Sequence, residues 1–489
     1  MTPIPSQRTR YQRRLKRPTK VTRARWAAWL VVRRTFDEDA WTDRAFTGVV
    51  EQLGLDDDPR ERAFAQRLAF GVVQQAKRLD HVIATLGKRP LRKVEPAVLH
   101  TLRIGVYELL ELQEATDEDG RRLGSSSAHA AVDQAVELVR GVVGERAVAF
   151  TNAILRRAQV DGAGILDALD PRDPADLAVQ LSMPDWLVAR ARDGHGETGI
   201  AALAAQNEPT PGTSFRVNPL GRTAFDRAAH AEEFLEAGVE LATPLLGRQA
   251  ATHALEAIGP TAPLARLIDD GTLVPQSLAS QLVATALDPQ PGERVLDMCA
   301  APGGKATHLA ALVGADGDVV AVELHEHRAD SVRALAERTN TSDIITVRVG
   351  DATELDPAEV GQFDRVLLDA PCSGTGVLAA RPDARWKRTE EGVDELVTLQ
   401  RALLEHAAAL AKPGGIVVYS TCSILREEDE AVAEAAPASL VPDPLPEALA
   451  HLATSPHTAR TWPQQHQTEG FFIARFRKVG DDPAAGGSA

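Results

Sequence analysis

The stretch V-L-D-M-C-A-A-P-G-G-K, residues 295–305, decides the fold of the second half of this chain. The run 294–298 is short and mostly apolar, as expected for a buried strand, and a tight P-G-G turn at 302–304 follows it. Residues 306–313 then have the composition of a helix. A strand, a glycine-rich turn and a helix in this order predict the nucleotide-binding corner of a doubly wound α/β sheet.

The turn itself suits a ligand, because its glycines let the backbone pass close to one and the helix N-terminus offers free N–H groups. The spacing is not G-x-G-x-x-G, so a pyrophosphate is not required. S-adenosylmethionine, which carries an amino-acid carboxylate in place of phosphates, would suit this corner. A single glycine-rich turn is a weak signal, and the strand ends that follow it strengthen the prediction.

Strand-like and helix-like runs alternate from residue 291 onward, which predicts a parallel sheet of Rossmann-like α/β class. The expected helices include 325–338 and 391–411. The expected strands are 294–298, 318–323, 344–349, 363–369, 415–420 and 471–477.

Polar residues stand where four of these strands end. Glu323 ends the second strand, where an acid can accept hydrogen bonds from both ribose hydroxyls, and Asp351 follows the third, where it would hold an adenine amino group. Asp369 ends the fourth strand, and Cys422 follows the fifth within T-C-S. Because parallel strands end along one edge of a sheet, we expect these side chains to line a single crevice.

The chain has three cysteines, Cys299, Cys372 and Cys422, which is no disulfide framework and fits a reducing cytoplasm. Cys372 and Cys422 lie just beyond adjacent strand ends. Neither a C-x-x-C pair nor a nearby histidine cluster indicates a metal site. Two thiols beside a nucleotide-type crevice suggest covalent catalysis.

The length of 489 residues predicts two or three domains. A formal net charge of −15 argues against a general polyanion binder. Residues 1–25, however, carry nine Arg or Lys and no acid, which predicts a basic arm able to contact phosphates; a merely solvated tail is the alternative. We expect no transmembrane span and no signal peptide, because no run of 18 apolar residues occurs and the N-terminus lacks an apolar segment.

The first third of the chain has apolar residues at helical spacing, which predicts an independent helical bundle. Its stretches L-R-I-G-V-Y-E-L at 102–109, A-V-D-Q-A-V-E-L at 131–138 and F-T-N-A-I-L-R-R at 150–157 resemble the NusB-like RNA-binding domain. The alternative is a bundle that only packs against its neighbour. The expected helices are 23–35, 59–85, 96–112, 127–143 and 145–158, with a polar linker at 113–126.

Three motifs of the second half carry a closer resemblance: D-M-C-A-A-P-G-G-K at 297–305, D-A-P-C-S-G-T-G at 369–376 and Y-S-T-C-S at 419–423. They resemble the motifs of the RNA 5-methylcytosine methyltransferases of the NOL1/NOP2/Sun family. With the NusB-like front end, the chain is most similar to the Sun/RsmB branch, which methylates 16S ribosomal RNA of the small subunit. The resemblance covers about residues 22–478.

The resemblance implies S-adenosylmethionine-dependent methylation of C5 of a cytosine. That carbon is a poor nucleophile, and a thiolate that adds at C6 turns the ring into an enamine whose C5 can attack an electrophilic methyl group. Cys422 is then the implied nucleophile, and Cys372 assists its release. Asp369 would bind either the N3/N4 edge of the cytosine or the cofactor, and Lys305 either the cofactor carboxylate or the base. The cofactor-binding residues are expected to be Cys299, Ala300, Ala301, Pro302, Gly303, Gly304, Lys305, Glu323, Asp351 and Asp369.

The implied partner is 16S rRNA or an assembly intermediate of the small subunit, without a membrane or a metal. Two alternatives stay open: the same chemistry on transfer RNA or another ribosomal site, and a non-catalytic RNA-binding assembly factor, against which the two cysteines and the acids speak. The expected organisation is a basic disordered arm (1–21), a NusB-like domain (22–160), a linker (161–180), a small α+β connecting or RNA-contacting subdomain (181–285), a methyltransferase domain (286–478) and a disordered tail (479–489).

Overall fold

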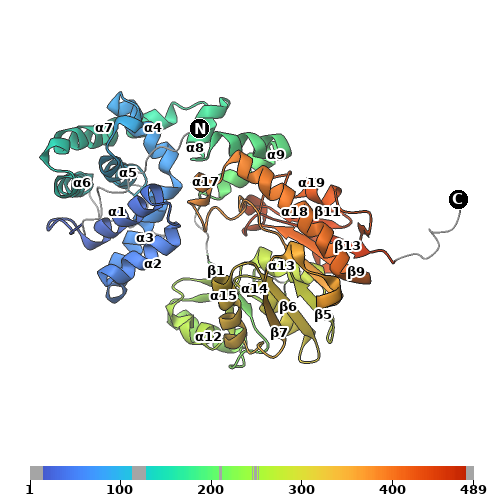
Figure 1. Cartoon of the computed structure of the whole chain (residues 1–489). Helices are drawn as coiled ribbons and strands as arrows, with labels where there is room; N and C mark the ends of the chain where they lie inside the picture. Colours follow the sequence, from blue (N-terminus) through green and yellow to red (C-terminus); the bar gives the residue numbers. More distant parts are fainter. Residues whose placement is uncertain are drawn as a thin grey trace. The chain divides into compact units, whose positions relative to one another are not determined.

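The computed structural model describes residues 15–112, 128–208, 212–244, 246, 251 and 253–480 (Figure 1). Most of the expected basic arm, the expected linker 113–126 and the tail from residue 481 lie outside the described residues. The chain divides into two compact units. The helical unit comprises Met1–Val188 with Arg381–Trp386, and the sheet unit comprises Ala189–Ala380 with Lys387–Ala489.

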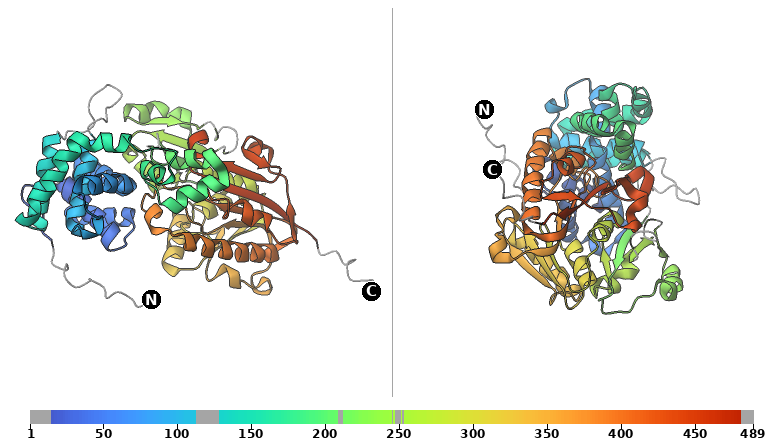
Figure 2. Two further views of the ribbon diagram at one scale, coloured as in Figure 1. Left: turned by 90° about the horizontal axis from the view of Figure 1, so that it is seen from above. Right: turned by 90° about the vertical axis from the view of Figure 1, so that its right-hand side faces the viewer.

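The helical unit is a bundle with α5 (Pro96–Leu110) at its centre, since all but three of the residues of this helix are buried. Figure 2 shows the bundle, in blue to blue-green, from two further sides. Trp26 and Trp29 stack in its core with ring centroids 5.3 Å apart. The predicted helical bundle is therefore confirmed. Its other helices are α1 (Arg23–Asp37), α2 (Thr42–Leu53), α3 (Pro59–Gln74), α4 (Ala76–Gly87), α6 (Ala128–Val142), α7 (Val148–Asp167) and α8 (Pro174–Gln180), with 3-10 turns at Leu55–Asp57, Leu91–Lys93 and Glu145–Ala147.

Two expectations for this unit were wrong in detail. The run 59–85 forms two helices, α3 and α4, separated at Gln75. The expected linker 161–180 is largely helical, because α7 continues to Asp167 and α8 follows. Gly162 does not break α7: a Cβ there would lie 2.9 Å from Leu110 Cδ2, so the glycine allows α7 to pack closely on α5.

The hexapeptide Arg381–Trp386, which follows the D-A-P-C motif by only a few residues, belongs to the helical unit. Asp383 accepts a hydrogen bond from Thr42 N (2.9 Å), and Trp386 Nε1 donates to Val73 O (2.7 Å). Arg385 is buried and donates to two backbone carbonyls, and its burial lowers the pKa to about 9. The helical unit thus includes a piece of the later sequence.

The sheet unit is built on one large mixed sheet, with strand order β11-β12-β13-β9-β8-β5-β6-β7 and β10 paired to β13. Strands β5 to β9 are paired in parallel, whereas β13 runs antiparallel to β9. The predicted Rossmann-like α/β fold is therefore confirmed. The strands are β5 (Arg294–Asp297), β6 (Asp318–Glu323), β7 (Ile345–Val349), β8 (Phe363–Asp369), β9 (Ala411–Thr421), β10 (Leu440–Pro442), β11 (Ala453–Ser455), β12 (Thr458–Thr461) and β13 (Phe471–Lys478).

Helices cover both faces of this sheet, which explains why its central strands are apolar at consecutive positions. Val295 packs in one core with α13 (Leu278–Leu287), α14 (Gly304–Val313) and α15 (Glu326–Arg338). The next residue, Leu296, packs in a second core with α18 (Glu390–Leu410). Shorter elements complete the unit: α16 (Pro357–Val360), α17 (Ala384–Lys387, shared with the helical unit), α19 (Glu430–Glu434), α20 (Pro463–His466), η5 (Ala352–Glu354) and η6 (Glu447–Leu452).

A small antiparallel sheet precedes the large one, with strand order β2-β3-β1-β4. The strand expected at 214–220 is β1 (Thr213–Val217), whose Phe215 is central to a separate apolar core. No described helix is both long and apolar enough to cross a membrane. The remaining elements of this region are α9 (Asp185–Ala205), α10 (Arg227–Glu236), α12 (Ala265–Asp269), η4 (Ala262–Leu264), β2 (Glu240–Ala242), β3 (Ala254–Ile258) and β4 (Leu273–Pro275).

Candidate active site

The strand order of the large sheet reverses at β5, which lies between β6 and β8. Ligands of open α/β sheets bind beyond the carboxyl ends of the strands at such a switch point. The turn after β5 is fixed there by both neighbours, since Met298 N donates to Leu367 O (3.0 Å) and Ala300 N donates to Val322 O (2.9 Å). The glycine-rich stretch therefore lies where the sequence predicted it, at the switch point.

The glycines of this turn have distinct roles. Gly303 has φ 109°, which favours glycine, and a Cβ there would lie 3.2 Å from Val332 Cα on α15. Gly304 begins α14, and no atom of the described chain lies within 4 Å of the position that its Cβ would take. Open space thus adjoins the N-terminus of α14, where free N–H groups are available. Ala300 is buried beneath the turn, Ala301 is half-buried and Pro302 is exposed.

Asp369 and Lys305 form an ion pair across the switch point, with Lys305 Nζ 2.8 Å from Asp369 Oδ2. Ser420 Oγ, at the end of β9, donates to the other carboxylate oxygen (2.9 Å). Burial alone would lower the pKa of Lys305, but Asp369 and the Cys422 thiol raise it above its ordinary value. The side chain therefore carries an ammonium group that faces both the acid and the sulfur.

Asp297, at the end of β5, is fully buried, and its Oδ2 has no hydrogen-bond partner among the described residues. Burial, reinforced by the charge of Asp369, raises its pKa from 3.8 to about 7. Asp297 was not among the predicted site residues. An unpartnered buried carboxyl oxygen at the switch point favours a ligand that brings a donor or a positive charge.

The two acids expected to hold the nucleoside part lie at the ends of β6 and β7. Glu323 is buried and accepts from His325 N (3.1 Å), and Arg328 lies 3.4 Å from its other oxygen. Asp351 is exposed, and its Oδ1 accepts from Thr353 N and Oγ1, so it also caps the short turn η5. These bonds lower the pKa of Asp351.

The sulfur atoms of Cys372 and Cys422 lie 3.4 Å apart. The hydrogen bond with Cys422, followed by burial, raises the pKa of the Cys372 thiol well above its ordinary value. Cys299 is also a free thiol, and burial raises its pKa. It packs against the apolar core that contains Leu296 and α18. Among the described residues, no group of three or more His, Cys, Asp or Glu has an arrangement that could hold a metal ion.

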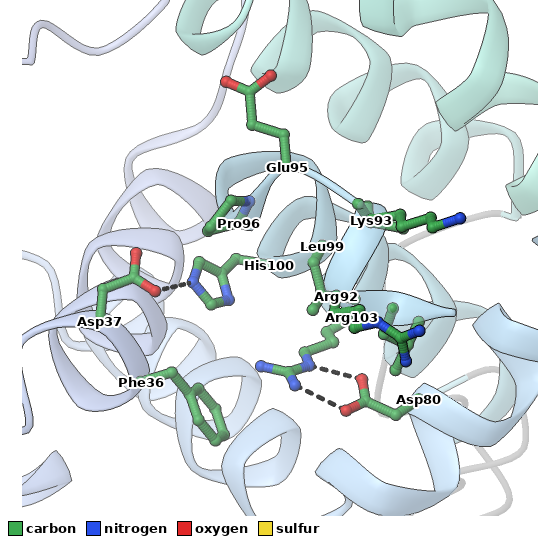
Figure 3. A pocket seen from close by; sticks show the side chains of 12 residues that line it. Phe36, Asp37, Asp80, Arg92, Lys93, Glu95, Pro96, Leu99, His100 and Arg103 are labelled. Carbon is green, nitrogen blue, oxygen red and sulfur yellow. Dashed lines mark hydrogen bonds and ion pairs between the residues drawn. The ribbon is translucent and has the colours of Figure 1, made fainter. Parts of the chain in front are cut away.

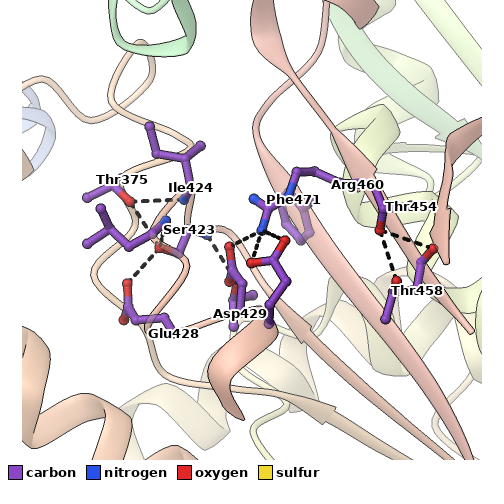
Figure 4. A network of polar contacts seen from close by, with 12 residues as sticks. Thr375, Ser423, Ile424, Glu428, Asp429, Thr454, Thr458, Arg460 and Phe471 are labelled. Carbon is purple, nitrogen blue, oxygen red and sulfur yellow. Dashed lines mark hydrogen bonds and ion pairs between the residues drawn. The ribbon is translucent and has the colours of Figure 1, made fainter. Parts of the chain in front are cut away.

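A buried polar network joins the two cysteine loops (Figure 4). Glu428 accepts from Ser373 N (2.8 Å), from Ser373 Oγ and from Ser423 Oγ (2.6 Å). Thr375 Oγ1 lies 3.0 Å from Ser423 Oγ and accepts from Ile424 N (3.1 Å). Ser373 directly follows Cys372, and Ser423 directly follows Cys422. The network therefore restrains the conformation of the chain just after both cysteines.

The neighbouring acid, Asp429, belongs to a second part of this network. It pairs with the buried Arg460 (2.8 Å) and accepts from Thr421 Oγ1, and Arg460 also reaches Glu430 (2.8 Å). Sequence reasoning missed Glu428, Asp429 and Arg460. The run R-E-E-D-E at 426–430 has the composition of a solvated surface, and only the proximity of the run to Cys422 distinguishes it.

The helical unit contains a pocket of about 670 Å³ between α1, α4, the 3-10 turn Leu91–Lys93 and α5 (Figure 3). Most of its charges are paired: Asp80 with Arg103 (2.7 Å) and Asp37 with His100 (2.9 Å). Burial lowers the pKa of His100, despite the neighbouring Asp37. Arg92 and Lys93 are exposed at the pocket, and no described carboxylate lies within ion-pair distance of either.

Known protein families match both halves of the chain. The family model "16S rRNA methyltransferase RsmB/F" matches residues 284–477, and that of the NusB family matches residues 22–160. The probable ribosomal RNA small subunit methyltransferase B of Synechocystis sp. is 33% identical over 477 residues, which are 93% of this chain and 99% of the relative. Its namesake from Bacillus subtilis is 31% identical over 452 residues, 90% and 95% of the two chains.

Solved structures share the fold. The crystal structure of PH0851 matches 94% of this chain and 100% of its own, with a TM-score of 0.75 at 25% identity. The structure of NSun6 from Pyrococcus horikoshii with SFG matches 61% of this chain and 99% of its own, with a TM-score of 0.53 at 21% identity. The second likeness bears on the fold alone.

Proposed function

Because this chain belongs to the RsmB/F family of 16S rRNA methyltransferases, we propose that it methylates C5 of a cytosine in small-subunit ribosomal RNA, with S-adenosylmethionine as the methyl donor. The observation that carries this proposal is the pair of thiols, 3.4 Å apart, beside the switch point of the sheet. A cytosine-C5 transfer needs a sulfur nucleophile, and a second thiol next to the first is suited to its release.

The residues at the switch point fit the cofactor. Gly304 leaves open space at the N-terminus of α14, where N–H groups suit the carboxylate of the cofactor. Asp297 has an unpartnered oxygen that suits the cationic part of the cofactor. In this proposal Glu323 accepts hydrogen bonds from the ribose hydroxyls, and Asp351 accepts one from the adenine amino group. When bound, the cofactor supplies the electrophilic methyl group that C5 takes up. The proposed cofactor residues are Cys299, Ala300, Ala301, Pro302, Gly303, Gly304, Lys305, Glu323, Asp351 and Asp369.

Cys422 is the proposed nucleophile. Its thiolate forms a bond to C6 of the cytosine, and the electron pair of the C5–C6 double bond makes C5 nucleophilic. After methyl transfer a base removes the C5 proton, the double bond forms again, and the bond between C6 and sulfur breaks. The Lys305 side chain lies close enough to this sulfur for Cys422 to be among the groups that raise the pKa of Lys305.

Cys372 assists the release step. Its pKa is raised, so it is a protonated thiol beside the departing sulfur. A thiol in contact with Cys422 can donate a hydrogen bond to the thiolate as it leaves. Asp369 is held by Lys305 and Ser420, so its carboxylate has a fixed position for either the cytosine edge or the cofactor.

The helical unit is the proposed source of RNA affinity. Arg92 and Lys93 are unpaired with any described acid, and the basic arm at 1–21 adds further positive charge. Phosphates of an RNA strand are the natural partners of such cations. Three free cysteines are compatible with the reducing cytoplasm, which is the proposed location.

Mass mapping of modified cytosines in cells that lack the protein tests the substrate. We expect one 5-methylcytosine of small-subunit rRNA to disappear and to return with the wild-type gene but not with Cys422→Ala. A loss in transfer RNA or at another ribosomal site would favour the same chemistry on that substrate. An unchanged set of modified cytosines would favour a non-catalytic assembly factor.

A further inference from the structure

Glu428 is a buried carboxylate that has no cation beside it. Its relative exposure is 0%, and no Lys, Arg or His of the described chain lies within ion-pair distance. Neutral groups satisfy it instead: Ser373 N, the hydroxyls of Ser373 and Ser423, and Gln400 Nε2 (3.1 Å). A buried charge held only by neutral donors is a costly way to stabilise a fold, which suggests another reason for this residue.

The donors of Glu428 come from both cysteine loops. Ser373 follows Cys372 and Ser423 follows Cys422, and the loops are about fifty residues apart in the chain. Gln400 on α18 extends the contact, since the same amide group donates to Pro371 O (3.0 Å) on the other side of Cys372. A single side chain thereby fixes the backbone next to both thiols.

Other bonds between the loops do not involve Glu428: Gly376 N donates to Cys422 O (2.9 Å), and Thr375 Oγ1 contacts Ser423 Oγ (3.0 Å) and accepts from Ile424 N (3.1 Å). None of these bonds involves the backbone N–H of Ser373, which donates to Glu428 (2.8 Å). Arg388 contacts the same loop from outside, with Nε 3.0 Å from Ser373 O. The carboxylate of Glu428 is therefore one group that binds both loops directly, at the residues that follow the two cysteines.

We propose that Glu428 is a positioning residue that holds the loops of Cys372 and Cys422 in register, so that the two sulfur atoms meet at the reaction centre. This inference rests on the proposed function, because it assigns Glu428 a task in the two-thiol chemistry. Glu428 touches neither the cytosine nor the cofactor in this scheme, and it acts only through the serines.

The charge of Glu428 adds a second effect. After the bond to Cys422 and burial, Glu428 is among the groups that raise the pKa of the Cys372 thiol. Cys422, in contrast, lies beside the Lys305 ammonium group. The two neighbouring thiols thus have unlike electrostatic surroundings, and Glu428 adds to the contact with Cys422 and the burial that raise the pKa of Cys372.

Two substitutions separate placement from charge. Glu428→Ala removes every bond to the serines. Glu428→Gln keeps the shape, because its oxygen can accept from Ser373 N while its amide donates to hydroxyls that rotate to accept. Asp443→Asn is the matched control: Asp443 is a buried acid of the same unit, bound to Arg475 (2.7 Å) and Arg477 (2.7 Å) and to neither cysteine loop.

Three measurements on the full-length chain test whether Glu428 positions the two sulfur atoms. Crosslinking by diamide measures how often the sulfurs meet: the two thiols lose two electrons and two protons to form a disulfide, and diamide is reduced to the hydrazine. Alkylation of Cys372 by iodoacetamide across pH, located by mass spectrometry, measures its protonation. Single-turnover adduct formation with rRNA measures the chemistry, and circular dichroism verifies folding.

We expect Glu428→Ala to crosslink and to form the adduct at least tenfold more slowly, with unchanged RNA affinity. Glu428→Gln should crosslink within about twofold of wild type and shift the alkylation profile of Cys372 to lower pH. Asp443→Asn should lose stability and keep both rates. A folded Glu428→Ala that crosslinks at the wild-type rate would overturn the proposal; if that variant does not fold, a wild-type crosslinking rate in the double variant Ser373→Ala with Ser423→Ala, which removes both hydroxyls that Glu428 binds, would overturn it.

The crosslinking comparison needs no RNA. If the wild-type protein forms no adduct with any RNA, the proposed function fails, and the crosslinking rates still decide whether Glu428 positions the sulfurs. The two claims can therefore fail separately.

Discussion

The sulfur atoms of Cys372 and Cys422 lie 3.4 Å apart, although 50 residues separate them in the chain. They follow β8 and β9, which are neighbouring parallel strands, with Asp369 opposite Ser420. The pairing of these strands therefore places both thiols together, beside the Lys305–Asp369 ion pair.

Glu323→Ala should weaken the binding of S-adenosylmethionine by about 1–3 kcal/mol, which is the cost of losing hydrogen bonds to a charged acceptor. Titration calorimetry measures this directly. Glu337→Ala, an exposed acid on α15, is the matched control and should leave the affinity unchanged. Equal affinities in wild type and Glu323→Ala would remove Glu323 from the cofactor site.

Asp297→Asn should make the stability of the protein less sensitive to pH. In the unfolded chain this carboxyl loses its proton near pH 4, whereas in the folded protein its pKa is about 7. Between these values the native state binds more protons, so the contribution of Asp297 to the free energy of unfolding falls as the pH rises from about 4 to about 7.

The asparagine variant has no such loss. Relative to wild type, its free energy of unfolding should be larger (the protein more stable) by about 2 kcal/mol more at pH 8 than at pH 5, since one pKa unit is about 1.4 kcal/mol. Guanidinium denaturation at the two pH values measures the difference. The same difference between variant and wild type at both pH values would show that Asp297 titrates normally.

Replacement of both Arg92 and Lys93 by alanine should weaken RNA binding and make it less dependent on salt. Each phosphate contact releases counterions, so the slope of log K against log salt should fall by about 1–2 in magnitude. The control is Arg60→Ala with Arg62→Ala, two exposed arginines of α3 that do not line the pocket. Equal slopes in both double variants would place the RNA elsewhere.

Deletion of residues 1–21 should reduce the same slope, because the deletion removes a run of basic residues without an acid. Filter binding over a range of salt concentrations with the full-length and shortened chains gives the comparison. A shortened chain that binds its RNA with full affinity and the same slope would make the basic arm a solvated tail.

The large sheet could be predicted from sequence because buried parallel strands are continuous apolar runs and each is followed by a distinct turn. β6 and β8 have the predicted bounds, and the others differ by a few residues. The short strands β10, β11 and β12 were missed. They lie near the edge of the sheet and pair with β13 or with each other, and nothing in their local composition sets them apart.

The site residues that belong to sequence motifs were predicted, and those that only the tertiary structure brings to the site were missed. Glycines, acids at strand ends and cysteines are visible in the sequence. Glu428 is a charged residue among other charged residues, and only the fold buries it under the cysteine loops. The placement of Arg381–Trp386 in the helical unit was likewise not predictable, because the contacts of Trp386 and Asp383 are with residues more than three hundred positions earlier.

The central claim, that Cys422 attacks the cytosine and Cys372 assists release, is tested most directly by denaturing electrophoresis of the protein after incubation with its RNA and S-adenosylmethionine. Cys372→Ala should accumulate a persistent enzyme–RNA adduct, because the bond to C6 forms but breaks slowly. Cys422→Ala should form no adduct and no methylated product while still binding the cofactor, and the double variant should form no adduct. An adduct in Cys422→Ala would mean that the two roles are reversed, and the absence of any adduct together with equal losses of stability in both single variants would mean that the cysteines are structural.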